Sequence, residues 1–213
     1  MNILIMGGPG AGKGTMSAKI VEKFGVLHIS TGDIFRSEVG NKTELGMKAK
    51  EYMNQGLLVP DEVTNPMVKS YLEKQDTTKG YLLDGYPRTL AQAEAFAELV
   101  KGSDLEIDMV LTLDIPFEVL SERITGRRLC KNCGAIYHIK NHPPKVEGIC
   151  DKCGSELYQR KDDTEESLKV RLEEYSKNAE PILNFYDSKV KTINANQDVN
   201  KVFEDILSAL ENH

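Results

Sequence analysis

Short runs of apolar residues alternate along the chain with longer segments in which apolar residues recur every three or four positions. Continuous apolar runs are typical of strands buried on both faces of a sheet, and the longer spacing is typical of amphipathic helices. Five runs predict strands, at residues 3–6, 26–29, 81–84, 109–113 and 190–193. Because strands and helices alternate, the pattern indicates an α/β fold with a five-stranded parallel sheet flanked by helices.

Amphipathic spacing predicts helices at residues 16–24, from 31, at 91–100, at 117–124 and at 202–210. Another helix is expected to begin after Asp163, which stands three residues before Glu166 as an N-cap does in a capping box. Pro181 is expected to kink or divide that helix. Pro66 is expected to delay the helix of its own segment, as the first helical residue after an Asn65 N-cap.

Residues 127–161 lack the aliphatic side chains that would build an apolar core, yet they contain all four cysteines of the chain. The cysteines form two C-x-x-C pairs separated by sixteen residues: Cys130 with Cys133, and Cys150 with Cys153. This spacing is a strong zinc signature, and four thiolates close a tetrahedral shell, so we expect a structural Zn²⁺. A disulfide or redox pair and reactive free thiols are the alternatives. His138 and His142 lie between the pairs, but four cysteines already fill the shell.

The composition fits one sizeable globular domain of 213 residues, of which 40% are hydrophobic and 28% charged. The formal net charge of −6 argues against a general nucleic-acid coat, whose affinity would come from a basic surface. A run of about 18 apolar residues would be needed for a membrane span, and none occurs. The first residues also lack the basic segment of a signal peptide. We therefore expect a cytoplasmic, reducing compartment, in which cysteines are more often metal ligands than disulfides.

A glycine-rich loop, Gly7-Gly8-Pro9-Gly10-Ala11-Gly12-Lys13-Gly14-Thr15, separates the first predicted strand from the first predicted helix. It fits the pattern G-x-x-x-x-G-K, in which backbone N–H groups and a helix N-terminus face one phosphate. We expect Lys13 to reach the β- and γ-phosphates and Thr15 to ligand Mg²⁺. Asp84, at the end of the third predicted strand, would organise Mg²⁺ through water beside this loop. The alternatives are a glycine-rich turn without a ligand and an ordinary loop aspartate.

Five further motifs follow this loop along the chain: Ile29-Ser30-Thr31-Gly32-Asp33-Ile34-Phe35-Arg36, Gly56-Leu57-Leu58-Val59-Pro60-Asp61, Leu83-Asp84-Gly85-Tyr86-Pro87-Arg88-Thr89-Leu90-Ala91-Gln92, Thr125-Gly126-Arg127-Arg128 and Tyr158-Gln159-Arg160-Lys161-Asp162-Asp163. Together with the loop, they make nearly the whole chain resemble an adenylate kinase of the long, zinc-bearing bacterial type. The segment from Asp84 to Thr89 is much more specific than a phosphate loop alone.

The resemblance implies a P-loop NTPase-like core at residues 1–29, 60–125 and 164–213. It also implies a small helical insertion at 30–59 that binds the nucleoside monophosphate, and a zinc-stapled lid at 126–163. The implied reaction is reversible, direct in-line transfer of the γ-phosphoryl group of ATP to AMP, which gives two ADP. Mg²⁺ would accompany ATP, and arginines would stabilise the transferring group.

The same resemblance assigns residues to roles. The ATP phosphates would be held by Gly10, Ala11, Gly12, Lys13, Gly14 and Thr15. The catalytic group would comprise Lys13, Asp84, Arg88, Arg123, Arg127, Arg160 and Arg171. The AMP site would be lined by Thr31, Arg36, Leu57, Leu58, Val59, Gly85, Tyr86, Pro87, Arg88 and Gln92. The base of ATP would lie near Tyr137, His138 and Gln197.

Arginine suits these roles because its planar guanidinium binds two phosphate oxygens at once, although a solvated surface charge is the alternative for each arginine. Residues 127–163 carry eight basic and five acidic side chains, so the lid is more positive than the chain as a whole. Two other functions stay open: a kinase of the same fold that accepts UMP, CMP or GMP, and a zinc ribbon that binds nucleic acid with the phosphate loop as an ATP switch. The resemblance favours a monomer whose partners are ATP, AMP and ADP, without nucleic acid or membrane.

Overall fold

The computed structural model describes residues 1–211 and contains a central sheet of five parallel strands. The strands are β1 (Ile3–Gly7), β2 (Leu27–Ser30), β3 (Tyr81–Asp84), β4 (Met109–Asp114) and β8 (Val190–Asn194). They lie in the order β2-β3-β1-β4-β8, and every neighbouring pair is parallel. The five strands and the fold class predicted from the apolar runs are confirmed.

Helices cover both faces of the sheet. They are α1 (Lys13–Phe24), α2 (Thr31–Gly40), α3 (Glu44–Gln55), α4 (Asp61–Lys74), α5 (Leu90–Val100), α6 (Phe117–Thr125), α7 (Glu165–Phe185) and α8 (Val199–Glu211), with a 3₁₀ turn at Asp187–Lys189. Ile3 and Ile5 face α1, α6, α8 and the start of α7, whereas Leu4 and Met6 face α4, α5 and the end of α7. Alternate residues of β1 therefore reach two cores, which explains the continuous apolar run. Among the described helices, none is long and apolar enough to cross a bilayer.

Two segments extend away from this layered core. Helices α2 and α3 form a small unit with its own apolar cluster of Phe35, Ala49 and Val59. The second segment forms a three-stranded antiparallel sheet, ordered β6-β5-β7. Its strands are β5 (Arg127–Cys130), β6 (Ile136–His138) and β7 (Leu157–Tyr158). The sequence pattern does not predict this sheet, because strands of two to four residues are too short to show a period.

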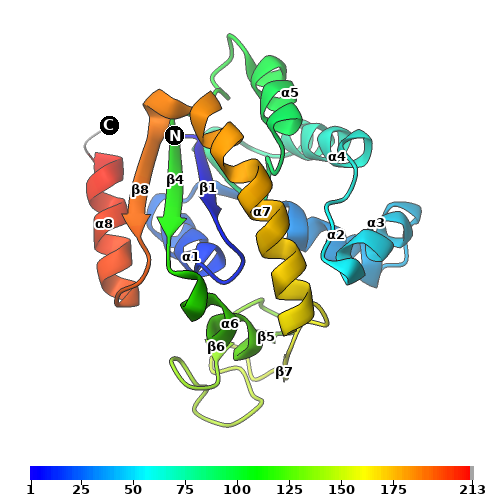
Figure 1. The fold of residues 1–213 in the computed structure, drawn as a ribbon, viewed down its shortest axis with the longest axis vertical. Helices are drawn as coiled ribbons and strands as arrows, with labels where there is room; N and C mark the ends of the chain where they lie inside the picture. The colour runs from blue at the N-terminus through cyan, green and yellow to red at the C-terminus, as the bar shows by residue number, and fades with distance from the viewer. Residues whose placement is uncertain (212–213) are drawn as a thin grey trace.

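The parallel register brings the carboxyl ends of the strands to one edge of the central sheet. Ile5 lies opposite Asp84, and Gly7 lies opposite Leu113. In Figure 1, the arrows of β1, β4 and β8 point toward the end of the molecule where α6 and the small sheet lie. The long helix α7 runs from that end back along the core. Ligands of open α/β sheets bind at the carboxyl edge, so this is where a site is expected.

The predicted N-cap of α7 is wrong by one residue. Thr164 is the N-cap, and its hydroxyl accepts a hydrogen bond from the backbone N–H of Ser167 at 3.2 Å. Asp163, the predicted cap, is instead buried in an ion pair with Arg127. Aspartate and threonine can both cap a helix. Because Asp163 pairs with the distant Arg127, the cap is left to Thr164.

The prediction for Pro66 is also wrong, and α7 is not divided at Pro181, whose expected kink stays a prediction. Helix α4 begins at Asp61, with Pro66 inside it, and α7 continues through Pro181 without a break. A proline in a helix interior removes one hydrogen bond and costs about 3 kcal/mol. Each helix buries side chains next to its proline, Val68 in α4 and Ile182 in α7, and this burial offsets the cost.

Candidate active site

The glycine-rich loop forms a tight turn between β1 and α1. Gly10 and Gly12 have φ angles of 87° and 98°, in the left-handed region that favours glycine. A Cβ atom at Gly10 would lie 3.0 Å from Cγ1 of Ile124, so α6 also approaches the loop too closely for a larger residue. The turn delivers the chain directly into the N-terminus of α1, which is the geometry of an anion site.

Lys13, the first residue of α1, turns its ammonium group back over the loop. Its Nζ donates hydrogen bonds to the carbonyl oxygens of Gly7 at 2.6 Å and Gly8 at 3.0 Å. Burial lowers the pKa of Lys13 to about 8, and nearby arginines act in the same direction while Asp84 opposes them. The ammonium group therefore lies inside the loop that would surround a phosphate.

Asp84 ends β3 beside Lys13. Burial alone would raise the pKa of its carboxyl group, but contact with His28 and the charge of Lys13 hold that pKa below its usual value. The Oδ2 atom lies 3.7 Å from Nε2 of His28. An ionised carboxylate is an oxygen donor of the kind that Mg²⁺ prefers, and the Thr15 hydroxyl is a second oxygen donor at the start of α1. These donors fit a magnesium ion.

Two adjoining pockets lie near the loop; they share several lining residues, and the second includes Gly7, Pro9 and Lys13 of the loop itself. Eight of the ten residues expected at the AMP site line the first pocket: Thr31, Arg36, Leu57, Leu58, Val59, Gly85, Arg88 and Gln92. The other two, Tyr86 and Pro87, line the second pocket together with Lys13. Arg88 and Arg171 line both pockets, so the two guanidinium groups lie where the pockets meet.

The turn that carries Arg88 is held by hydrogen bonds on several sides. The Arg88 backbone N–H donates to Oε1 of Gln92 at 2.7 Å, and Arg88 Nε donates to the Gly85 carbonyl at 2.7 Å. Thr31 Oγ1 also donates to the Gly85 carbonyl, at 2.8 Å. Gln92 Nε2 in turn donates to Oδ1 of Asp61 at 2.6 Å. Asp61 thus positions Gln92, a role that the sequence analysis missed although its motif included the residue.

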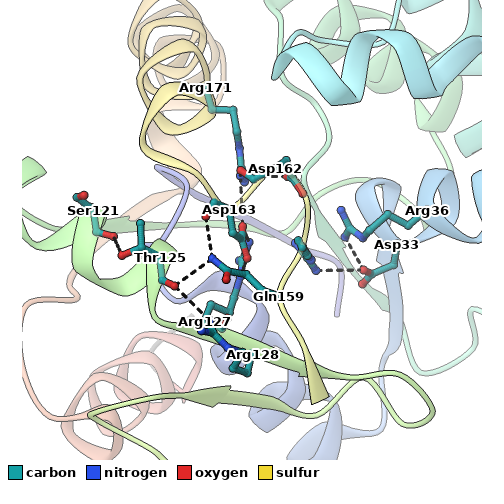
Figure 2. Close-up of polar contacts among 11 residues, drawn as sticks. Asp33, Arg36, Ser121, Thr125, Arg127, Arg128, Gln159, Asp162, Asp163 and Arg171 are labelled. Carbon is teal, nitrogen blue, oxygen red and sulfur yellow. Dashed lines mark hydrogen bonds and ion pairs between the residues drawn. The ribbon is translucent and has the colours of Figure 1, made fainter. Parts of the chain in front are cut away.

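Ion pairs join the two ends of the predicted lid, residues 126–163 (Figure 2). Arg127 donates from Nε to Oδ2 of Asp163 at 2.9 Å and from Nη2 to Oδ1 of the same carboxylate. Arg171, on α7, lies 3.2 Å from Asp162 Oδ2 and 3.8 Å from Asp163 Oδ1. The Asp163 side chain is 0% exposed, so its partners replace the water that it has lost. The sequence analysis did not predict these ion pairs of Asp162 and Asp163, because their arginine partners are distant in sequence.

A second ion cluster connects the lid to the small α2–α3 unit. Asp33 Oδ1, on α2, lies 2.5 Å from Arg36 Nη2 and 3.6 Å from Arg160 Nη2. Figure 2 shows Arg36 and Asp33 side by side on α2. Burial lowers the pKa of Arg160 to about 10, and the charges of Arg36 and Arg127 act in the same direction. These guanidinium groups are therefore close enough to repel one another.

The site as a whole carries an excess of positive charge. Burial lowers the pKa of Arg171 to about 10, and the charges of other arginines add to this effect. Six basic side chains gather here: Lys13, Arg36, Arg88, Arg127, Arg160 and Arg171. Five carboxylates lie among or beside them: Asp33, Asp84, Asp162, Asp163 and Glu174. Such incomplete compensation around pockets suits ligands that bear several phosphates.

Arg123 and Gln197 are not brought into this group. Arg123 Nη2 donates to the carbonyl of Ala195 at 3.1 Å, just after β8. Gln197 Nε2 donates to the Asn194 carbonyl at 3.0 Å and to Asp205 Oδ2 at 2.6 Å. Burial lowers the pKa of Arg123 without a contribution from the other arginines. Both side chains therefore lie near the end of β8, and their expected roles stay predictions.

Tyr137 and His138 do not line either pocket. Tyr137 is 3% exposed, and its hydroxyl accepts a hydrogen bond from the Asp151 backbone N–H at 2.8 Å. Its ring stacks on His142 with 5.4 Å between the ring centroids. His138 Nε2 lies 3.0 Å from the Glu122 carbonyl oxygen and so links β6 to α6. Their expected contact with the base of ATP stays a prediction.

The four cysteines gather in the lid, as their spacing predicts. Their sulfur atoms all lie within 4.8 Å of one another, and the cysteines are free, without a disulfide. The Sγ atoms of Cys130 and Cys153 are 3.3 Å apart, and those of Cys133 and Cys150 are 3.6 Å apart. Four Zn–S bonds of about 2.3 Å in a tetrahedron need sulfur separations of about 3.8 Å. The cluster fits one Zn²⁺, and its ligand set includes neither His138 nor His142.

Basic pockets beside a phosphate loop, at the carboxyl edge of a parallel sheet, place the chain among the P-loop enzymes that transfer phosphoryl groups. The model of the adenylate kinase family matches residues 5–191. Adenylate kinase of Geobacillus sp. (strain WCH70) is 53% identical over 212 residues, which are 99% of this chain and 98% of that protein. Those of Clostridium acetobutylicum and Thermoanaerobacter sp. (strain X514) are 51% and 52% identical, over 99% of this chain and 99% and 98% of theirs. The chain therefore belongs to the adenylate kinase family of nucleoside monophosphate kinases.

Proposed function

We propose that this chain transfers the γ-phosphoryl group of ATP to AMP and produces two ADP in a reversible reaction. The observation that carries the proposal is the pair of guanidinium groups, Arg88 and Arg171, where the two pockets meet. The second pocket includes Lys13 of the phosphate loop, and the first is lined by Thr31, Leu58 and their neighbours. Two nucleotides bound in these pockets would bring their phosphates together at the arginines.

The chemistry needs no protein nucleophile. An oxygen of the AMP phosphate attacks the γ-phosphorus of ATP, and the bond from that phosphorus to the β–γ bridging oxygen breaks. The electron pair stays on the β-phosphate of the departing ADP. Arg88, Arg127, Arg160 and Arg171 would neutralise the charge on the transferring group, while Lys13 would leave its loop carbonyls for a phosphate oxygen.

Asp84 and Thr15 would hold the Mg²⁺ that accompanies ATP. When bound, the ion supplies positive charge that neutralises the phosphate oxygens. The support for Asp84 is its ionised carboxylate at the end of β3, next to Lys13.

We infer that residues 30–59 and 126–163 move against the core, which comprises residues 1–29, 60–125 and 164–213. The Arg160–Asp33 contact supports this division, because it joins the two moving units to each other without the sheet. Closure of both units would exclude water, which would otherwise compete with AMP for the γ-phosphoryl group.

We also infer that the four cysteines bind a structural Zn²⁺, and that the protein is a cytoplasmic monomer. The support for the metal is the sulfur geometry of the cluster in a segment with little apolar core. The support for a reducing compartment is the metal-ligand spacing of the two C-x-x-C pairs, because cysteines in reducing compartments are more often metal ligands than disulfides.

The decisive experiment measures ADP formation from ATP with AMP, UMP, CMP and GMP as acceptors in separate assays. We expect turnover with AMP to exceed turnover with each of the others at least tenfold. Preference for UMP, CMP or GMP would keep the class of enzyme and change the acceptor. Absence of turnover with all four, together with salt-dependent binding of RNA or DNA, would overturn the proposal in favour of a zinc ribbon.

A further inference from the structure

His28 lies beside Asp84 at the edge of the central sheet, outside the groups that would contact the nucleotides directly. Strand β2 is an edge strand that pairs with β3 alone in the sheet. In the register of this pair, His28 lies opposite Leu82, and Ser30 lies opposite Asp84. Residues two apart on a strand face the same side, so His28 and Asp84 share the face that carries α1 and the phosphate loop.

The imidazole presents one nitrogen atom to the carboxylate. Nε2 of His28 lies 3.7 Å from Oδ2 of Asp84, which is longer than a hydrogen bond but within one small side-chain movement of it. The same Nε2 atom is buried and has no hydrogen-bond partner. A buried donor without a partner costs about 1–3 kcal/mol, so a short approach to Asp84 would stabilise the site.

Lys13 is the second basic side chain that acts on the Asp84 carboxylate. Its charge acts on Asp84, while its Nζ is engaged by the carbonyl oxygens of Gly7 and Gly8. Asp33 is a second carboxylate close enough to act on Asp84 by repulsion. If Lys13 moves to a phosphate, its charge also turns toward that phosphate, and His28 is the N–H group in place to keep the orientation of the Asp84 carboxylate.

We propose that His28 is a positioning residue: its Nε2–H donates a hydrogen bond to Asp84 Oδ2 and fixes the carboxylate in the orientation that holds the magnesium ion of the bound nucleotide. The proposal rests on the proposed function, because it concerns the carboxylate assigned there to the metal. A neutral imidazole is sufficient, since only one N–H is needed. Loss of this hydrogen bond should weaken binding of the metal-loaded nucleotide and leave the fold unchanged.

The test compares two substitutions that differ in the reach of their donor. His28→Gln places an amide N–H near the position of Nε2, whereas His28→Asn has the same amide on a shorter side chain. His28→Leu removes the donor altogether. Each variant is made in the wild-type background and with Asp84→Asn. Because the cysteine cluster would lose its metal to a chelator, the magnesium-free arm uses buffer prepared without magnesium instead.

Calorimetry measures ADP binding with and without Mg²⁺, which requires no turnover. We expect His28→Leu and His28→Asn to weaken binding of Mg·ADP about tenfold, the size of a lost hydrogen bond to a charged group, and to leave binding of metal-free ADP unchanged. His28→Gln should restore the affinity to within about threefold. With Asp84→Asn present, His28→Leu should have no further effect. The Mg²⁺ concentration that gives half-maximal activity should rise in the same variants.

Three results would overturn the proposal: unchanged Mg·ADP affinity in His28→Leu, equal losses for ADP with and without Mg²⁺, or an equal effect of His28→Leu when Asp84→Asn is present. If His28→Leu does not fold, the Gln and Asn variants decide, and equal behaviour of those two overturns it. Failure of the proposed function is a different outcome, because wild-type protein would then bind ADP without transferring a phosphoryl group to AMP.

Discussion

Arg127, the first residue of β5, forms a buried ion pair with Asp163, the residue before the N-cap of α7. The pair joins the two ends of the lid. Two hydrogen bonds from one guanidinium reach both oxygens of the carboxylate, and the Asp163 side chain is 0% exposed. Breaking a buried pair by removal of one partner leaves an uncompensated charge and costs about 3–5 kcal/mol. We therefore expect Asp163→Ala to lower the free energy of unfolding by about that amount, measured by urea denaturation.

An exposed pair in the same lid provides the control. Lys131 and Glu156 contact each other with side chains that are 57% and 71% exposed, and exposed pairs contribute less than about 1 kcal/mol. Glu156→Gln should therefore leave the unfolding curve nearly unchanged. Equal effects of the two substitutions would show that the buried pair does not hold the lid.

Arg88→Ala and Lys13→Met are expected to reduce phosphoryl transfer in a protein that still folds. Arg88 is exposed to the pocket, and the Lys13 ammonium contacts loop carbonyls alone among the described hydrogen bonds. Arg88→Ala and Lys13→Met should each lower kcat by about 10³ or more, if these residues act on the transferring group as phosphate-binding arginines do. The measurement is coupled-assay turnover, with circular dichroism to confirm the fold.

Arg128 is the matched control for these substitutions. Its Nη1 donates to the carbonyl oxygens of Thr125 at 3.2 Å and Arg127 at 2.7 Å, and it lines neither pocket. Arg128→Ala should change kcat less than about tenfold. Near-normal turnover of Arg88→Ala or Lys13→Met would contradict the assignment of that residue to the site.

Much of the core could be predicted from the sequence, and the reasons are local. Buried parallel strands such as Ile3–Gly7 need side chains for two cores, so their apolar runs are continuous. The phosphate loop is readable because its positive φ angles demand glycine at fixed positions, as at Gly10 and Gly12.

The remaining features depend on contacts between distant residues. The position of Asp163 is set by Arg127, 36 residues away, so local capping rules place the N-cap of α7 at the wrong residue. The Asp61–Gln92 hydrogen bond spans 31 residues, and nothing in the local pattern indicates it. Arg123 illustrates the same limit, because the chain places its guanidinium on Ala195, 72 residues away.

Lys13 gives a pH prediction. Burial lowers its pKa from 10.5 to about 8 in the nucleotide-free protein, so raising the pH through about 8 removes its charge before ATP binds. Since kcat/KM reports the free enzyme, kcat/KM for ATP should fall above pH 8 by about tenfold per pH unit. The profile is measured from pH 7.5 to 9.5 at saturating AMP and Mg²⁺. A level profile to pH 9.5 would contradict the prediction.

Stability should change in the opposite direction over part of this range. Between about pH 8 and 10.5 the unfolded chain binds a proton at Lys13 that the folded protein has released, so this residue makes folding more favourable as the pH rises. Lys13→Met should lack the contribution. Comparison of thermal unfolding for the two proteins across that range tests the sign.

The cysteine cluster predicts one Zn²⁺ per chain. Protein purified without a chelator should contain one equivalent of zinc by mass spectrometry of the metal. A chelator that prefers zinc to magnesium should lower the melting temperature by about 2–4 °C for each kcal/mol of lost stability, because metal binding is linked to folding of the lid. A metal content of zero, or iron in place of zinc, would overturn the assignment of the ion.

Gly126 provides a steric test of the junction between α6 and the lid. Its φ of −82° suits any residue, so backbone strain is not involved. A Cβ atom there would lie 2.2 Å from Nε2 of His138. That ring cannot swing aside freely, since Nε2 contacts the Glu122 carbonyl at 3.0 Å and Nδ1 accepts hydrogen bonds from two backbone N–H groups at 3.1 Å. Gly126→Ala should therefore displace β6 from α6 and destabilise the protein by about 1–3 kcal/mol.

Gly40→Ala is the control: a Cβ atom at this last residue of α2 would meet nothing within 4 Å, so the change should stay within about 0.5 kcal/mol. His138→Ala removes the hydrogen bonds of the ring and should itself destabilise the protein, but Gly126→Ala should cost less in that background than in the wild type, because the added Cβ atom then meets no ring. Denaturation of the wild type, the three single variants and the Gly126→Ala/His138→Ala double variant measures these differences, and a Gly126→Ala protein as stable as Gly40→Ala would show that the lid is not held against α6 by this ring.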